Sequence, residues 1–391
     1  MSHEHHAHEH HDDIIYPSAI PFVLLHLACF GILWTGVSAW SLALCGALYG
    51  VRMFGVTAGY HRYFSHRSYR TSRVGQFLLA VLCQTSAQQG ILWWASKHRD
   101  HHRHADTPED VHSPRHAGFF FSHVGWIFSV KRGEADYSNI GDLTKFPELV
   151  WIDRHKYLPA TLLGVACWLF GGWEGLFVGF FLSTVILYHC TFAINSLAHV
   201  VGKQRYLTGD DSRNNWWLAL ITLGEGWHNN HHYYMSSTRQ GFRWWEIDPT
   251  YYVLRALSWI GVVYELRDPP AHVVTGERRA GRAVVEKVAR QLADTFSADA
   301  ISEQVRAAWA HLPELDELRA RLQAARTEAG TAWAEVHLPH VPTVDELKER
   351  ARQMFAHTPS LDEIAERSRQ LIVQAVSVRL LGSPEQGPTP A

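Results

Sequence analysis

The sequence predicts an all-α integral membrane protein with four transmembrane helices, arranged as two hairpins, and a histidine-rich helical cap on the cytoplasmic side. Three observations predict it. Of the 391 residues, 47% are hydrophobic and only 19% are charged. The apolar residues gather into long runs almost without charge, and many of the 27 histidines form spaced clusters beside those runs. The formal net charge of −2 excludes a strongly basic nucleic-acid-binding protein.

Two charge-poor runs are each long enough for a pair of membrane-spanning helices. Residues 14–51 contain no Asp, Glu, Lys or Arg, and the only such residue within 157–202 is Glu174. Because about 20 helical residues cross a bilayer core, each run predicts a hairpin. The turns are expected near 35–38 and 171–175. Such long charge-free runs are rare in soluble domains, which disfavours a buried hairpin in a soluble core.

The loop charges predict the orientation in the membrane. The two hairpin turns carry no Lys or Arg, whereas the segment between the hairpins is rich in them. These basic residues include Arg62, Arg67, Arg70, Lys97, Arg99, Lys131 and Arg154. By the positive-inside rule, this segment and both termini are expected to be cytoplasmic in a multi-pass protein. The opening residues 1–13 lack the basic start of a secretory signal and are interpreted as a histidine-rich disordered tail.

A third charge-free run, residues 74–96, is a poor membrane span because it contains several glutamines. These are Gln76, Gln84, Gln88 and Gln89. A span here would also place His61 and His98 on opposite sides of the membrane. We therefore interpret the run as an amphipathic or buried helix at the cytoplasmic face.

The composition changes after Asp268-Pro-Pro, which predicts a membrane domain over 14–270 and a charged helical cytoplasmic extension over 271–391. Within the extension, three segments begin alike, at Pro313, Pro342 and Pro359. Each places acids in a first helical turn and Arg later, which suits the helix dipole. We expect a string of surface helices here.

Four histidine clusters lie where the cytoplasmic ends of the hairpins are expected. They are H-R-Y-F-S-H from His61 to His66, H-R-D-H-H from His98 to His102, N-S-L-A-H from Asn195 to His199, and H-N-N-H-H from His228 to His232. Residues i, i+3 and i+4 share a helix face, so each H-x-x-H-H is predicted to present three imidazoles to one place. His61 and His66 are five apart and diverge on an ideal helix. Their cluster is therefore expected to straddle a helix end or to reach two separate metals.

The candidate metal ligands are His61, His66, His98, His101, His102, His199, His228, His231, His232 and Asn195. They are too many for one ion and suit two, with positions left for water or oxygen. Imidazole binds zinc, copper, iron and nickel, and the lack of cysteine in the clusters argues against structural zinc. An all-imidazole site at a membrane surface favours redox-active iron, while copper and zinc also fit the spacing. Nearby histidines are expected to hold the rings' other nitrogens, namely His104, His112, His116 and His123.

The ordered histidine clusters and the two hairpins resemble the membrane-bound fatty-acyl desaturase family. The nearest likeness is to the delta-9 acyl-CoA (stearoyl-CoA type) desaturases and their bacterial relatives. It covers residues 14–270 and rests on G-Y-H-R-Y-F-S-H from Gly59, G-F-F-F-S-H-V-G-W from Gly118, N-S-L-A-H from Asn195, G-D-D-S-R-N-N-W from Gly209 and G-E-G-W-H-N-N-H-H from Gly224. One such motif is weak evidence, whereas the ordered set is specific.

The resemblance implies that the nine histidines hold two irons and that Asn195 holds a bound water. It further implies that two electrons and O2 remove two hydrogens from adjacent methylenes. The reaction leaves a cis double bond, expected at delta-9, and releases oxygen as water. The implied substrate is acyl-CoA, and a phospholipid-bound or carrier-bound acyl chain stays open.

Methylene groups carry no polar atom that a protein could recognise. We therefore expect the shape of a bent apolar tunnel to select which carbons of the acyl chain react. By alignment with the family, the residues expected at the bend are Gln88, Trp94, Thr191 and Phe192. Animal relatives carry Arg-Asp, associated with the CoA headgroup, where this chain has Ser96-Lys97. The departure weakens the headgroup assignment and leaves Lys97 as a candidate phosphate contact.

The electrons are expected from a separate ferredoxin, small haem cytochrome or flavin reductase, because no H-P-G-G motif of a fused haem domain is present. A basic surface would attract an acidic donor.

Two other functions stay open. A diiron membrane hydroxylase of alkyl or lipid substrates would retain oxygen in its product. A metal transporter would place its ligands at mid-bilayer.

Overall fold

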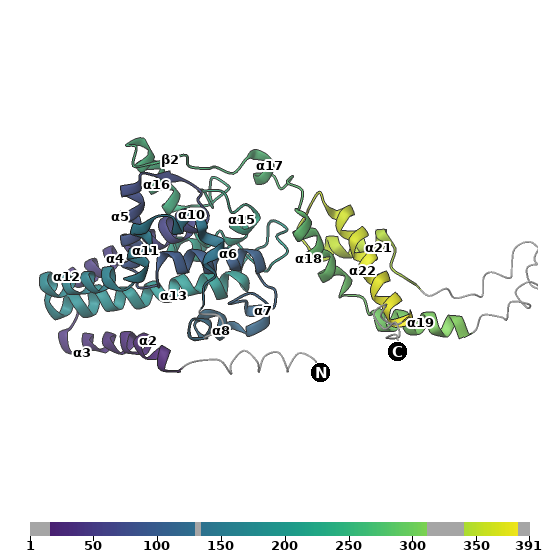
Figure 1. Cartoon of the computed structure of the whole chain (residues 1–391), viewed down its shortest axis with the longest axis horizontal. Coiled ribbons are helices and arrows are strands. Elements are labelled where there is room, and N and C mark those ends of the chain that lie inside the picture. The colour runs from purple at the N-terminus through teal and green to yellow at the C-terminus, as the bar shows by residue number, and fades with distance from the viewer. Residues whose placement is uncertain (1–15, 130–133, 311–339, 382–391) are drawn as a thin grey trace, which may run out of the picture. The chain divides into compact units, whose positions relative to one another are not determined.

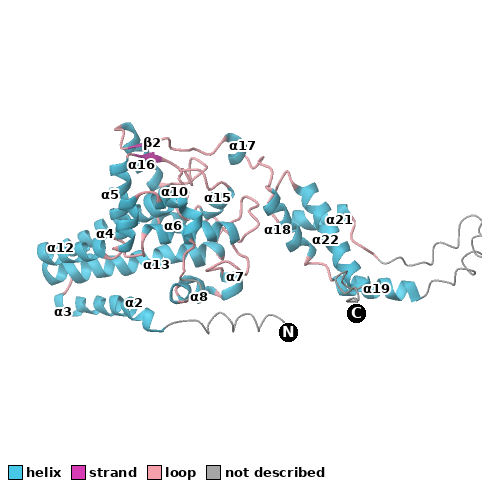
Figure 2. Ribbon diagram, in the orientation of Figure 1, coloured by secondary structure: helices cyan, strands magenta, loops and turns pink. Residues whose placement is uncertain are grey.

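The computed structural model of the chain is mostly helical, and its described residues include one short pair of strands (Figures 1 and 2). It describes residues 16–129, 134–310 and 340–381. The predicted tail 1–13, Lys131 and the predicted helix after Pro313 lie outside the described residues. The chain divides into two compact units, residues 1–276 and residues 277–391.

The first apolar run forms a helical hairpin. Its arms are α2 (Tyr16–Ala28), η1 (Cys29–Gly31) and α3 (Ile32–Thr35), then α4 (Ala39–Phe54) and η2 (Gly55–Ser65). Gly36 makes the turn with a φ of 76°, which favours glycine. Ser38 then caps α4 in a capping box with Ser41. Glu174, the only acid of the other run, accepts a hydrogen bond from the Ser38 N–H. The predicted turn is confirmed.

The second apolar run also folds back on itself. It comprises α12 (Leu158–Glu174), η5 (Gly175–Leu182), α13 (Ser183–Ser196) and η6 (Leu197–His199). Gly172 breaks the helix with φ 60° and ψ −155°, which confirms the predicted turn. A Cβ at Gly175 would lie 2.5 Å from the Cys167 carbonyl oxygen, so the arms approach closely. Two segments of the described chain are long and apolar enough to cross a membrane, Ala39–Ser65 and Leu158–His199.

Shorter elements complete the first unit around these hairpins. They are β1 (Arg70–Thr71), α5 (Arg73–Gln84), α6 (Ile91–His104), α7 (Pro114–Ala117), α8 (Phe119–His123), η3 (Gly125–Phe128), η4 (Tyr137–Ile140), α10 (Gly141–Thr144), α11 (Pro147–Arg154), α14 (Trp216–Ile221), α15 (His228–Tyr233), α16 (Pro249–Trp259), β2 (Val263–Tyr264) and α17 (Ala271–Val274). Strands β1 and β2 pair antiparallel. Helix α5 has 12 residues, too few for a span of about 20, in agreement with the interpretation of this run as non-spanning.

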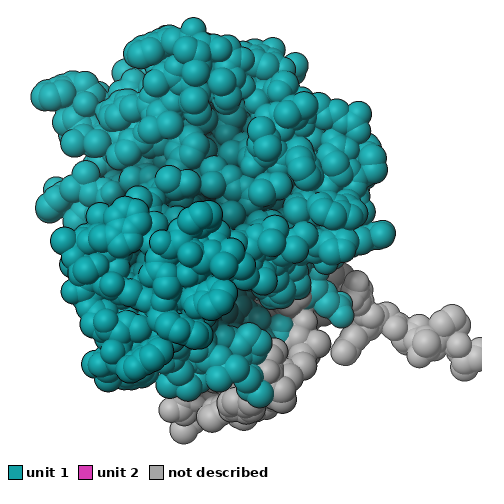
Figure 3. All heavy atoms as spheres, turned by 90° about the vertical axis from the view of Figure 1, so that its left-hand side faces the viewer, with its two compact units in different colours: residues 1–276 teal, residues 277–391 magenta. Residues whose placement is uncertain are grey.

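The core of the first unit lies where η2 packs on α5 and α6. A Cβ at Gly59 would be 2.1 Å from the Cys83 sulfur, so only glycine allows this approach of η2 to α5. The hairpin arms, by contrast, expose large apolar side chains, including Leu33 (84% exposed) and Phe170 (88%). Figure 3 shows this unit from the side on which α3 and α12 lie in Figure 1. Such exposure suits contact with lipid.

The second unit is a small helical bundle. Its described helices are α18 (Arg282–Ala293), α19 (Ala298–Ala310), α21 (Val344–Met354) and α22 (Leu361–Leu381). Thr343 and Glu346 form a capping box at the start of α21. Buried side chains such as Leu292, Leu347 and Ile364 form its core.

Candidate metal centre

The nine histidines of the four clusters converge in two groups. Group A is His61, His66, His98, His102 and His231, and group B is His101, His199, His228 and His232. Within each group the ligand nitrogens lie within 4.8 Å of one another. The groups draw on η2, α6, η6 and α15, which bring together residues far apart in the chain.

Each H-x-x-H-H motif serves both groups, which corrects the prediction that it presents three imidazoles to one place. On α6, His98 and His102 belong to group A, whereas His101 belongs to group B. On α15 the division is reversed, because only His231 joins group A. Adjacent residues of an α-helix diverge by about 100°, so the i+3 and i+4 side chains point to neighbouring places.

The first cluster reaches a single group because η2 is a π-helix. The His66 N–H donates to the His61 carbonyl at 3.2 Å, a five-residue repeat. This wider turn brings residues five apart to one side. The rings of His61 and His66 are 4.9 Å apart between centroids, and both belong to group A. The prediction that this cluster straddles a helix end is confirmed, because η2 ends at Ser65 and His66 follows it. The alternative prediction, that the two histidines reach separate metals, is wrong, because both belong to group A.

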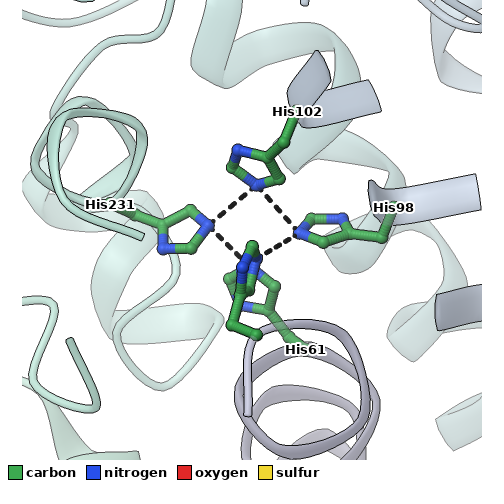
Figure 4. A group of neighbouring side chains, drawn as sticks. His61, His98, His102 and His231 are labelled. Carbon is green, nitrogen blue, oxygen red and sulfur yellow. Dashed lines mark hydrogen bonds between the residues drawn. The ribbon is translucent and has the colours of Figure 1, made fainter. Parts of the chain in front are cut away.

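The spacing of the ring nitrogens fits metal coordination. Figure 4 shows the rings of His61, His98, His102 and His231 pointing toward one another. The Nε2···Nε2 distances are 3.0 Å for His61–His231, 2.9 Å for His231–His102, 3.0 Å for His102–His98 and 2.8 Å for His66–His98. Two nitrogens at right angles about one ion, each about 2.1 Å from it, lie about 3.0 Å apart. In group B, the buried Nε2 of His232 has no hydrogen-bond partner among the described residues, as suits a free ligand atom.

Carboxylates hold four of the nine rings through Nδ1. The pairs are His199–Asp106 at 2.8 Å, His101–Asp110 at 3.0 Å, His232–Asp210 at 3.0 Å, and His61–Glu225. An ionised carboxylate only accepts hydrogen bonds, so Nδ1 carries the proton and Nε2 is left for a metal. The sequence had predicted histidines for this task. In the described part of the chain, the predicted histidines do not hydrogen-bond a ring of either group. They are His104, His112, His116 and His123.

Helix spacing did not predict the carboxylates, because these residues lie in loops. Asp106 and Asp110 follow directly after the second cluster, in D-T-P-E-D, and Asp210 belongs to the G-D-D motif. A short acidic loop beside a histidine cluster is the signal that would have found them. Arg62, counted as a basic loop residue, is buried and forms ion pairs with Glu225 and Asp248 at 3.1 and 3.0 Å.

Burial sets the protonation states around the groups. Burial lowers the pKa of His98 and His102 well below the usual range of histidine, so both rings are neutral at pH 7. Burial alone would raise the pKa of the Asp210 carboxyl, but the facing His232 holds that pKa well below its usual range. Neutral imidazoles beside an ionised carboxylate are the states that metal binding requires.

An apolar cavity of about 590 Å³ reaches group A, because His98 lies on its wall together with Asn195. All five residues predicted to contact substrate line it, namely Gln88, Trp94, Thr191, Phe192 and Lys97. The Trp94 ring stacks on His98 with centroids 4.9 Å apart. The Gln88 amide donates to the Thr191 hydroxyl at 3.1 Å, so α13 and the loop before α6 meet across the cavity.

The sequence is similar to that of several known proteins. The family model described as fatty acid desaturase matches residues 38–264. An acyl-CoA 5-desaturase of Anemone leveillei is 39% identical over 63% of this chain and 77% of its own length. An sn-1 stearoyl-lipid 9-desaturase of Anabaena variabilis is 37% identical over 54% of this chain and 78% of its own. A palmitoyl-monogalactosyldiacylglycerol delta-7 desaturase of Arabidopsis thaliana is 37% identical over 62% and 65%.

Proposed function

Because the chain belongs to the fatty acid desaturase family, we propose that it introduces a cis double bond, at position 9, into a saturated acyl chain carried by CoA. The proposal rests mainly on the apolar cavity, which could hold an acyl chain. His98, a member of group A, lies on the wall of this cavity. The relatives act at positions 5, 7 and 9 and on both CoA and lipid carriers. Position and carrier are therefore the finer part of the proposal.

Groups A and B fit two iron ions, one for each group, with Asn195 holding one of them through a water. When bound, two irons would supply the redox chemistry of the reaction. O2 is reduced to water by two electrons from the donor and by the removal of two hydrogens from the acyl chain. The remaining work belongs to the protein. The carboxylates Asp106, Asp110, Asp210 and Glu225 orient four ligand rings. Low polarity in the cavity excludes water from the reacting methylenes.

The cavity wall is proposed to place one pair of methylenes beside the metals. The hydrogen-bonded pair Gln88 and Thr191 narrows the cavity on one side, and Phe192 and Trp94 border it with aromatic rings. Lys97 is 7% exposed and also lines the cavity. We assign its ammonium to the phosphate of the acyl carrier.

Membrane placement follows the same proposal. Each helical hairpin crosses the bilayer twice, which makes four spans, with both termini and the metal groups on the cytoplasmic side. The folding back at Gly172 supports two crossings in the second apolar segment. A separate ferredoxin, small haem cytochrome or flavin reductase supplies the electrons.

Expression in a host with a compatible reductase tests this function. The fatty acids of cells making the full chain are compared by mass spectrometry with those of cells making His228→Ala. We expect a new monounsaturated acid, with its double bond at carbon 9, only with the unchanged chain. A hydroxylated acid would instead assign the protein to the membrane hydroxylases. A double bond at another carbon would keep desaturation and overturn the position.

A further inference from the structure

A second cavity, of about 290 Å³, opens where α5 begins and has a strongly basic wall. Its arginines come from two distant parts of the chain and are Arg67, Arg70, Arg73 and Arg267. Among the described residues that line it there is no Asp or Glu. It shares no lining residue with the apolar cavity on whose wall His98 lies. We call it the arginine pocket.

Two buried donors in the arginine pocket lack partners. The Gln76 side chain is 2% exposed, and its amide oxygen accepts a hydrogen bond from the Tyr63 hydroxyl at 2.9 Å. Its Nε2, and the buried Nη1 of Arg67, have no hydrogen-bond partner in the described part of the chain. Buried donors are rarely left unpaired, so the pocket is built to receive an acceptor.

Carboxylates neutralise only part of the charge. The ion pairs are Arg73–Glu148 at 2.7 Å, Arg70–Glu265 at 2.9 Å and Arg67–Asp142 at 3.6 Å. Asp142 is shared with Arg99, which it contacts at 2.7 Å. The Arg267 guanidinium has no carboxylate within ion-pair distance among the described residues, so the pocket keeps a net positive charge.

Exposed apolar side chains lie on α5, which supplies Arg73 and Gln76 to the arginine pocket, and on α16, which contacts β2. Val74 and Leu78 of α5 are 70% and 61% exposed, and Trp259 and Ile260 at the end of α16 are 77% and 73% exposed. Tyr264, which pairs with Arg70 across the two strands, is 45% exposed. Aromatic and aliphatic side chains beside arginines are typical of a membrane–water interface, where basic pockets bind lipid headgroups.

We propose that the arginine pocket binds the phosphate of an anionic phospholipid from the surrounding membrane. Guanidinium groups match phosphate oxygens in geometry and charge, and the Gln76 amide adds a donor at the bottom of the pocket. The lipid tails then lie along the exposed apolar residues of α5 and α16. This inference requires only that the protein lies in a membrane, and it is independent of the acyl reaction.

Native mass spectrometry of the full chain in detergent tests the proposal. The protein is titrated with phosphatidylglycerol and with phosphatidylcholine of the same acyl chains. We expect one phosphatidylglycerol to bind at least about tenfold more tightly than phosphatidylcholine. Arg267→Gln should weaken that binding about tenfold, because it removes an exposed, unpaired charge from the pocket. Arg255→Gln removes the same charge from α16 outside the pocket and should leave binding unchanged.

Two further binding measurements identify the ligand and its binding site. Thr191→Trp obstructs the apolar cavity, so phosphatidylglycerol binding that survives this change is not substrate binding there. Inorganic phosphate is titrated alone against the Arg267→Gln and unchanged proteins. Equal affinities for the two lipids, or no effect of Arg267→Gln, would overturn the proposal. Phosphate that binds the unchanged protein as tightly as phosphatidylglycerol does would assign the pocket to a free anion and overturn the lipid source.

Discussion

Replacing His231 by alanine is expected to release metal and to lower desaturation by at least about a thousandfold. Its Nε2 lies 3.0 Å from that of His61 and 2.9 Å from that of His102, so it joins η2 to α6 within group A. Removing the ring takes away a ligand and leaves the neighbouring nitrogens without their partner. Bound iron per chain and the double-bond product are the two measurements.

His155→Ala is the matched control for this change. His155 is an exposed histidine of the same unit, and it hydrogen-bonds only the Trp151 carbonyl among the described residues. Iron content and turnover should be unaffected. If His231→Ala kept two irons and normal turnover, group A would not be a metal site.

Filling the apolar cavity at Thr191 is expected to stop the reaction while leaving the metals in place. Thr191→Trp puts an indole opposite Gln88, where the long acyl chain is proposed to pass. Misplacing the reacting methylenes by about 1 Å costs roughly a hundredfold in rate, and blocking the passage costs at least as much. Turnover of a saturated acyl substrate and iron per chain are measured together.

Ile186→Trp provides the comparison on the same helix. Ile186 lies on α13, is 40% exposed and does not line the cavity. This variant should retain both iron and turnover. Loss of iron in Thr191→Trp would mean that the substitution disturbed the metal groups. Full activity with iron retained would show that the cavity is not the acyl path.

The hairpins were predictable because their signals are local. A bilayer span requires many consecutive residues without charge, and glycines such as Gly36 and Gly172 mark where the chain turns back. The candidate ligand histidines were also visible in the sequence, since i, i+3 and i+4 spacing places side chains on one side of a helix. Neither pattern depends on distant parts of the chain.

The internal arrangement of the site was not predictable in the same way. The π-helical turn that unites His61 and His66 forms where η2 is packed against α5 through Gly59, a tertiary contact that no local spacing reveals. The support of His199 by Asp106 joins a loop to a helix end far along the chain. Such partners become visible only when the fold brings them together.

A single turnover under ¹⁸O₂ tests whether groups A and B hold two irons and whether the protein then desaturates an acyl chain. The purified protein is loaded with ferrous iron, reduced chemically, and given a saturated acyl-CoA. We expect two irons per chain, one double bond for every two electrons, and the label in water alone. Label retained in the acyl chain, or an unchanged chain with both irons bound and reduced, would contradict this expectation.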